Sequence, residues 1–245
     1  RRAGLRRQLK QHPCDACRDL ETHARWAERW WKLKRQRDDL TRQISLRTGA
    51  VAKVFDRVSE VLLALGYLVR DSTGVVSVGQ HGRLLRRIYG ERDLLVAECL
   101  RRGVWSDLDP AGLAAMAATL VYEPRRDEGQ LSDRHLPRGA FRPALDKTPE
   151  LWSKLDDLEQ EHRLPGSAPL SSGLSLAMSR WAQGARLDSV LGDADLAAGD
   201  FVRLTKQTID MLDQISLVAD AKVARNARTA LDSIRRGIVA YSSVA

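Results

Sequence analysis

Two cysteines and two histidines near the start of the sequence have the residue types of a metal site. Cys14 and Cys17 form a Cys-x-x-Cys knuckle, with His12 before it and His23 after it. Two thiolates and two imidazoles can complete a tetrahedral zinc shell, because a knuckle lets both sulfurs reach one ion. However, paired knuckles are the strong zinc signal, and a redox dithiol would be accompanied by a βαβ pattern, which is absent from this sequence. The pattern therefore favours a packed turn before a helix, and zinc at these residues is the alternative.

A second set of candidate residues lies on a helix expected over residues 201–219. Arg203, Lys206 and Gln207 recur at steps of three and four on its polar side. Such side chains on a central helix can line a channel for a single nucleic-acid strand. The same spacing is typical of an ordinary solvent-facing side, with a Lys206–Asp210 ion pair, and the pattern alone favours that interpretation. The same solvent-facing interpretation applies to the later basic positions, Arg225, Arg228, Arg235 and Arg236.

Catalytic motifs are not recognisable in the sequence. A nucleotide-hydrolysing site needs a glycine-rich loop that ends in Gly-Lys-Ser or Gly-Lys-Thr, and no such loop occurs. Residues 80–87 superficially resemble the arginine motif of helicase motors, but their spacing differs, so we interpret them as a turn and the start of a helix. The histidines lie in no recognisable triad, and Cys99 falls on an apolar helix face. We therefore expect neither catalysis nor a bound cofactor in this chain.

Composition and charge narrow the class of protein. The chain has 245 residues, of which 43% are hydrophobic and 29% charged, and it has no unbroken apolar run long enough to cross a membrane. Collagen-like, disordered and membrane-spanning classes are thereby excluded. Three cysteines and the lack of a leader lead us to expect a cytoplasmic protein. Residues 1–47 hold 14 lysines and arginines against 6 acidic residues, so the whole net charge of +8 lies there. This suits a segment that meets phosphate or an acidic partner, and equally a solvated helix face.

The pattern of elements predicts a mainly α fold in three parts. Residues 1–47 are expected to form a basic stalk helix with the Cys-x-x-Cys turn, residues 48–91 the latter part of a winged-helix domain with a short β wing, and residues 92–245 a multi-helix bundle.

The stalk helix is indicated by residues 20–45, which contain no glycine or proline and have apolar residues at steps of three, four and seven. Such a narrow seam needs a partner helix. Because the chain begins at Arg1 without a methionine, we expect a preceding segment to supply that partner. An uncovered seam would also favour self-association through Trp26, Trp30 and Trp31.

The winged-helix prediction rests on a helix followed by a hairpin. A helical pattern over residues 51–65 ends at Gly66, and two short strands, 67–69 and 75–78, flank a turn at residues 71–74. Modules of this kind pack against proteins about as often as they read a nucleic-acid groove, so the fold alone does not fix the function.

In the bundle, Asp109 and Pro110 predict a helix start, with an aspartate cap and a proline in the first position. Residues 124–149 carry 4 prolines and no periodicity, so we expect a long loop there. Further helices are expected over residues 151–161, 174–182, 201–219 and 223–241. The buried face of the 201–219 helix is expected to consist of Phe201, Leu204, Thr205, Thr208, Leu212, Ile215 and Ala219.

Several segments resemble those of one family, in the same order along the chain. The most specific are residues 98–115 (ECLRRGVWSDLDPAGLAA) and 120–123 (LVYE). They are similar to the leader of the C-terminal (DSHCT) domain of superkiller-type DExH-box RNA helicases. The start of the stalk helix is similar to the returning stalk helix of bacterial, actinobacterial-like members. Further resemblances to this family lie at residues 61–68, 75–83, 178–185, 199–206 and 234–241.

The resemblance implies a role in RNA translocation. In that family, a winged helix and a helical bundle close a ring with two RecA-like motor domains, which hydrolyse ATP with magnesium and move single-stranded RNA 3′ to 5′. Residues 199–206 resemble the start of its ratchet helix, which implies that Arg203 contacts RNA with Lys206 and Gln207 beside it. We therefore expect the C-terminal accessory region of an ATP-dependent RNA helicase, without motor domains and not catalytic by itself. The implied partners are single-stranded RNA, the motor domains of the parent chain, and RNA-degradation or RNA-processing machinery.

Two other classes stay open. One is a stand-alone winged-helix and coiled-coil module that binds nucleic acid or protein without a helicase partner. The other is a small zinc protein organised around Cys14 and Cys17.

Overall fold

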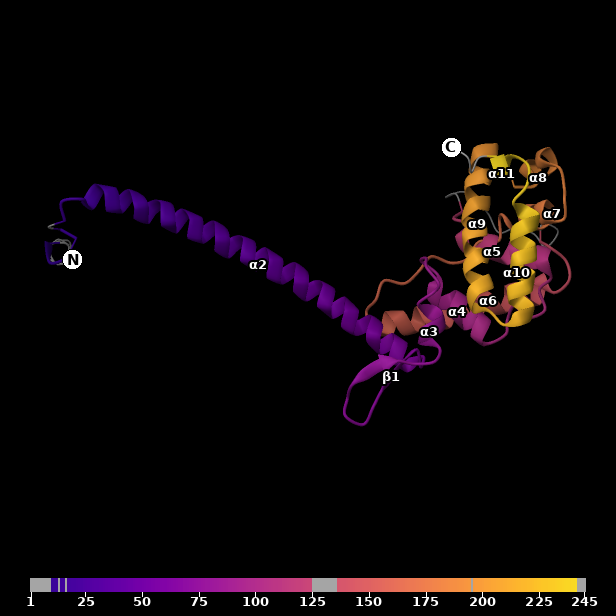
Figure 1. The fold of residues 1–245 in the computed structure, drawn as a ribbon, viewed down its shortest axis with the longest axis horizontal. Coiled ribbons are helices and arrows are strands. Elements are labelled where there is room, and N and C mark those ends of the chain that lie inside the picture. The colour runs from indigo at the N-terminus through magenta and orange to yellow at the C-terminus, as the bar shows by residue number, and fades with distance from the viewer. Residues whose placement is uncertain (1–9, 13, 16, 125–135, 195, 242–245) are drawn as a thin grey trace. The chain divides into compact units, whose positions relative to one another are not determined.

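The computed structural model describes residues 10–12, 14, 15, 17–124, 136–194 and 196–241. The chain divides into two compact units, residues 1–56 and 57–245; our division into three parts stays a prediction. The mainly α prediction is confirmed, since the described residues form helices and one two-stranded antiparallel sheet (Figure 1). The elements are α2 (Leu20–Ala64), β1 (Leu68–Arg70), β2 (Val76–Val78), α3 (Gly82–Leu85), α4 (Asp93–Arg101), α5 (Pro110–Val121), α6 (Phe141–Glu161), α7 (Ser175–Ala182), α8 (Leu187–Ala194), α9 (Ala198–Val218), α10 (Ala221–Ile234) and α11 (Ile238–Tyr241).

Helix α2 joins the two helical stretches that the sequence indicated, 20–45 and 51–65, into one helix of 45 residues. Gly49 lies inside it, at a cost of about 1 kcal/mol relative to alanine. The apolar seam lies on the helix surface, as a coiled-coil pattern predicts. Its exposed large side chains include Trp26, Trp30, Leu33, Leu40, Ile44, Val51 and Val54.

The predicted hairpin is confirmed. Strands β1 and β2 pair with Leu68 opposite Val78. Their turn is held by the carboxylate of Asp71, whose Oδ1 accepts hydrogen bonds from the Thr73 amide at 2.8 Å and the Val75 amide at 2.9 Å. The Thr73 hydroxyl and these amides lower the pKa of Asp71.

Glu98 on α4 connects the start of the hairpin to the bundle. Its carboxylate accepts hydrogen bonds from the hydroxyl of Tyr67 at 2.7 Å, Nη2 of Arg101 at 2.8 Å and Nε of Arg102 at 2.8 Å. Burial by itself would raise the pKa of Glu98, but the three donors outweigh it and hold the pKa below its usual value. Burial and the neighbouring carboxylate raise the pKa of Tyr67. Glu98 is therefore a buried charge whose ionised form is stabilised by its partners.

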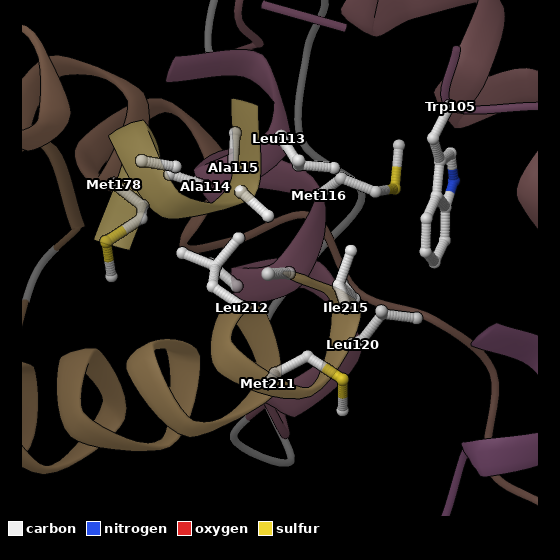
Figure 2. Packing of buried hydrophobic residues seen from close by; sticks show 14 of the residues in the cluster. Trp105, Leu113, Ala114, Ala115, Met116, Leu120, Met178, Met211, Leu212 and Ile215 are labelled. Atoms are coloured by element: carbon white, nitrogen blue, oxygen red, sulfur yellow. The ribbon is translucent and has the colours of Figure 1, made fainter. Parts of the chain in front are cut away.

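The core of the bundle is built around α5, which packs against α7, α9 and α10. Leu113, Met116 and Leu120 of α5 lie close to Leu212 and Ile215 of α9 (Figure 2). In Figure 1, α9 and α10 run side by side, in agreement with their close packing. The alanines of α5 let these helices approach closely, because a methyl group fills little space.

Cys99 is buried in this core, as its position on an apolar helix face predicts. Burial raises the pKa of the Cys99 thiol to about 12. Nearby, Nε1 of Trp105 donates a hydrogen bond to the Thr148 hydroxyl at 3.1 Å. The polar atoms that enter this part of the core therefore have partners.

Helix α5 begins with the cap that the sequence predicts. Asp109 precedes the helix with Pro110 in the first position, and its Oδ1 accepts a hydrogen bond from the Gly112 amide at 2.7 Å. We expect Asp109→Ala to lower the free energy of unfolding by about 1 kcal/mol, because that amide loses its partner. Urea denaturation measures the loss. Asp213→Ala, which removes an exposed carboxylate within α9, is the matched control; equal losses in the two variants would contradict the assigned cap.

Helix α6 corrects the prediction that residues 124–149 form a loop. The helix begins at Phe141 and includes Pro149. Pro143 lies in the first turn, where no amide is needed for an intrahelical bond, and tertiary packing outweighs the bond that Pro149 cannot form. The central part of the expected loop, residues 125–135, lies outside the described residues. The packed face of α6 consists of Phe141, Ala144, Thr148, Leu151 and Leu155.

The expected helix over residues 223–241 is interrupted at Gly237, where φ is +53° and glycine is favoured. This break accompanies a correction for Arg236, which we interpreted as solvent-facing. Its side chain is partly buried, and Nη2 donates 2.7 Å hydrogen bonds to the carbonyl oxygens of Trp181 and Ala185. The guanidinium also lies 3.5 Å from the centre of the Trp181 ring. Arg236 therefore fixes the end of the chain's last long helix.

Candidate functional site

Helix α9 has the buried side and the polar side that its sequence predicts. Phe201, Leu204, Thr205, Thr208, Leu212 and Ile215 are buried, whereas Ala219 is partly buried and lies just beyond the helix. The hydroxyls of Thr205 and Thr208 donate to carbonyl oxygens one turn earlier, at 2.7 and 2.8 Å. These bonds satisfy the polar groups of the buried side.

Two adjoining hollows border the polar side of α9. One, of about 230 Å³, is lined by Val121, Tyr122, Glu123, Leu196, Asp200, Arg203, Leu204 and Gln207. The other, of about 410 Å³, is lined by Tyr89, Gly90, Glu91, Arg92, Leu120, Val121, Glu123, Gln207, Asp210, Met211 and Gln214. We call these two hollows together the α9 groove. They share Val121, Glu123 and Gln207, so the groove passes between α9 and the end of α5.

The structure brings two of the three predicted contact residues together. Arg203 and Gln207 line the same hollow. The side chain of Arg203 is 60% exposed, and its Nη2 lies 3.7 Å from Oδ1 of Asp200. Lys206 is partly buried and lines neither hollow. A solvent-exposed pair of this kind contributes little stability, so Arg203 can exchange Asp200 for another partner.

The lining of the α9 groove is acidic overall. Its basic side chains are Arg92 and Arg203, and its acidic ones are Glu91, Glu123, Asp200 and Asp210. Carboxylates disfavour closely spaced phosphates but accept hydrogen bonds from base edges and ribose hydroxyls. The carboxylates of the groove can therefore accept hydrogen bonds from a ligand, while Arg203 and Gln207 can donate them.

A larger hollow of about 710 Å³ adjoins the groove and shares Glu91, Arg92, Tyr122 and Glu123 with it. Burial lowers the pKa of Arg92, whose Nη1 is buried without a hydrogen-bond partner among the described residues. Burial also raises the pKa of Asp93, and burial together with nearby carboxylates raises that of Glu159. Within the described part of the chain, no three histidine, cysteine or acidic side chains are grouped as a metal site would require.

The Cys-x-x-Cys turn brings two of its four candidate ligands close together. Sγ of Cys17 lies 3.5 Å from Nδ1 of His23. Nδ1 of His12 instead accepts a hydrogen bond from the Cys14 amide at 3.2 Å. Cys14 is exposed and Cys17 partly buried, so the thiols are less packed than we expected. Zinc at this turn stays a hypothesis.

The helices that form the α9 groove lie in a region of the chain that is similar in sequence to a known domain family. The sequence model of the DSHCT (NUC185) domain matches residues 76–242. The chain belongs to the DSHCT family. This confirms the resemblance found in the sequence, and the matched DSHCT region contains every residue that lines the α9 groove.

Relatives of this DSHCT chain include proteins named as helicases. It is 38% identical to the protein named "Probable helicase HelY" of Mycobacterium leprae, over 98% of this chain and 27% of that protein. The protein of the same name from Mycobacterium tuberculosis is also 38% identical, over 97% of this chain and 27% of its own length. The Arabidopsis thaliana "DExH-box ATP-dependent RNA helicase DExH15 chloroplastic" is 26% identical, over 89% of this chain and 19% of that protein. The chain thus spans about a quarter of the length of the mycobacterial relatives.

Sequence reasoning missed the residues of the DSHCT region that face α9 from elsewhere in the chain. The amide of Tyr89 donates a 2.6 Å hydrogen bond to Oε1 of Gln214, which fixes residues 89–92 beside α9. Glu123 follows the last turn of α5 and lines both hollows. These residues have no local pattern in common, and only the DSHCT resemblance at 120–123 pointed toward one of them.

Among the described helices, none combines the length and hydropathy that a membrane crossing needs.

Proposed function

We propose that this chain is the C-terminal accessory region of an ATP-dependent RNA helicase and that its α9 groove holds single-stranded RNA. The observation that carries the proposal is the pairing of Arg203 and Gln207 in one hollow on a central helix. Membership of the DSHCT family and the names of the relatives support the helicase and RNA parts. The site would contribute positioning, since the groove contains no recognisable catalytic motif.

Each side chain of the groove has a distinct task in this proposal. Arg203 binds a phosphate or stacks on a base, and the amide of Gln207 can donate to and accept from a base edge. Glu123 accepts hydrogen bonds from a base or a ribose hydroxyl. Lys206 lies beside them and adds positive charge. Arg203 and Gln207 stand one turn apart on α9, and Glu123 lies just after α5, which packs against α9. The two helices therefore set the spacing of these residues, as a ratchet acting on a moving strand requires.

The remaining steps of the proposal concern the parent protein. ATP and magnesium would bind in RecA-like motor domains of the parent chain, which would move RNA 3′ to 5′ past α9. The hairpin would belong to a winged helix that closes the ring, and the exposed seam of α2 would pair with another stalk helix. We place this protein in the cytoplasm, with RNA-degradation or RNA-processing machinery as its further partners.

Arg203→Gln tests the proposed groove directly. We expect the dissociation constant for a fluorescein-labelled oligouridine to rise about tenfold, since a charge-assisted hydrogen bond is lost. If that bond is to a phosphate, the slope of log affinity against log salt should fall by about 0.7. Fluorescence anisotropy across a salt series measures both quantities.

Arg225→Gln on α10 is the control for Arg203→Gln, because it removes the same charge from an exposed position outside the groove. Equal affinities of the wild type and Arg203→Gln would refute the assigned site. Duplex DNA that competes better than single-stranded RNA would instead favour a stand-alone winged-helix module.

A further inference from the structure

The segment that follows the hairpin, residues 79–90, carries an unneutralised positive charge. It contains Arg83, Arg86 and Arg87 and no acidic residue. All three arginines are exposed, and within the described part of the chain none of them has an ion-pair partner. Arg83 lies in α3, and Arg86 and Arg87 follow three and four residues later, just beyond its end, so the three arginines lie within five consecutive residues. This arrangement leaves the three guanidinium groups available to the same ligand.

The backbone beneath these arginines is held firmly. Gly82 packs so closely on the hairpin that a Cβ at this position would overlap the carbonyl oxygen of Tyr67. The Gly79 amide donates a 2.9 Å hydrogen bond to the same oxygen, and Ile88 is buried in the core. The main chain that carries these arginines is therefore held in place, which reduces the conformational entropy that is lost when a ligand binds.

The same segment leads directly into the α9 groove. Tyr89 is fixed through its main-chain amide by Gln214, while the residue as a whole is 72% exposed. Tyr89 and Gln207 line one hollow. Gln214 lies seven residues after Gln207 on α9, a rise of about 10 Å along the helix axis. A strand that occupies the hollow near Gln207 is thus within a short distance of the Tyr89 ring.

We propose that single-stranded RNA leaves the α9 groove across Tyr89, which stacks on a base, and that Arg83, Arg86 and Arg87 bind the phosphates beyond it. This inference rests on the proposed function, because it extends the same RNA path. The acidic lining of the groove offers few cations to phosphates, whereas the three arginines offer them without competing carboxylates on their own segment. An exposed aromatic ring beside a basic surface is the combination that binds single strands independently of sequence.

The test compares the triple variant Arg83→Gln/Arg86→Gln/Arg87→Gln with wild type in the full 245-residue chain. We expect the affinity for fluorescein-labelled oligouridine to fall at least tenfold at low salt, and the salt slope to fall by up to about 2, since each lost phosphate contact removes about 0.7. Tyr89→Ala should weaken binding about tenfold, while Tyr89→Phe should retain the wild-type affinity because the stacking ring remains. Circular dichroism checks that each variant is folded.

The triple variant Arg186→Gln/Arg225→Gln/Arg235→Gln is the matched control, since it removes the same charge from exposed arginines outside segment 79–90. Equal losses in the two triple variants, or no loss in the first, would overturn this inference while a weakened Arg203→Gln would still support the proposed function. Duplex RNA that competes as well as single strands would overturn the stacking role of Tyr89. A wild-type chain that binds no single-stranded RNA would overturn both proposals.

Discussion

Trp181→Ala is expected to lower the free energy of unfolding by about 3–5 kcal/mol, among the largest effects of any single substitution in this chain. The indole is only 2% exposed, and its ring meets that of Phe201 edge to face with centroids 5.6 Å apart. Its Nε1 donates a 2.9 Å hydrogen bond to the carbonyl oxygen of Ile234. The alanine variant would leave a cavity, an Ile234 carbonyl oxygen with one hydrogen bond fewer and an Arg236 guanidinium without its ring.

Trp26→Ala provides the control for Trp181→Ala, because the Trp26 side chain is 63% exposed on α2. We expect its effect to stay within about 0.5 kcal/mol. Chemical denaturation followed by far-ultraviolet circular dichroism compares the two variants. Trp181→Phe should lose less than Trp181→Ala, since most of the buried ring remains. Similar stability of Trp181→Ala and Trp26→Ala would show that α7, α9 and α10 do not depend on this contact.

Glu98→Gln is the second large expected effect, a loss of about 2–3 kcal/mol at neutral pH. The carboxylate is 1% exposed and accepts hydrogen bonds from Tyr67, Arg101 and Arg102. The amide keeps the shape but has no charge, and one of its two polar atoms can no longer accept. The two arginines are partly exposed and can turn toward water, which keeps the loss below that of a fully buried ion pair.

The same carboxylate makes the stability depend on pH. Its pKa is lower in the folded than in the unfolded chain, so in acid the unfolded state binds more protons. The stabilisation is complete above the ordinary glutamate pKa of about 4.5 and is lost as the pH falls through the lowered pKa of the folded state. The stability gap between wild type and Glu98→Gln should therefore narrow below that pH. Glu150→Gln, at an exposed position, should give no such gap, and a Glu98→Gln gap that stays constant in acid would contradict the assignment.

Local signals in the sequence were sufficient for several elements. The cap at Asp109 and Pro110, the turn at Asp71 and the buried face of α9 were predicted because each depends on residues within a few positions of one another. Hydrogen bonds of caps and turns, and the period of a helix, act over that range.

The errors arose where tertiary contacts outweighed local preferences. Pro149 suggested a loop, yet the packing of Phe141 and Leu151 holds α6 together through it. Arg236 belonged to a basic pattern typical of solvent-facing residues, but it binds the carbonyl oxygens of Trp181 in α7 and of Ala185 just after that helix. In both cases the contacts are made to residues far away in the sequence: α6 packs against α4 and α5, and Arg236 binds Trp181. Local periodicity does not indicate such contacts.

For the candidate site, the sequence placed Arg203 and Gln207 on one side of a helix and the family resemblance suggested their role. The sequence did not show which residues form the opposite wall of the groove. Tyr89 and Glu123 are brought to α9 by the packing of the whole bundle, and only the structure shows that they line it. Nor did the sequence show the acidic lining, which depends on which carboxylates share a hollow.

At position 89 the main chain attaches the segment to α9 through Gln214, while the side chain is free of that task. Since the donor is the main-chain amide of residue 89, any residue except proline can keep this bond, whatever side chain it carries. The side chain at position 89 is thus open to change during evolution or in a binding-preference screen, while the hydrogen bond to α9 depends on the side chain of Gln214. A substitution at position 89 can therefore change what this surface binds without weakening the attachment of residues 89–92 to α9.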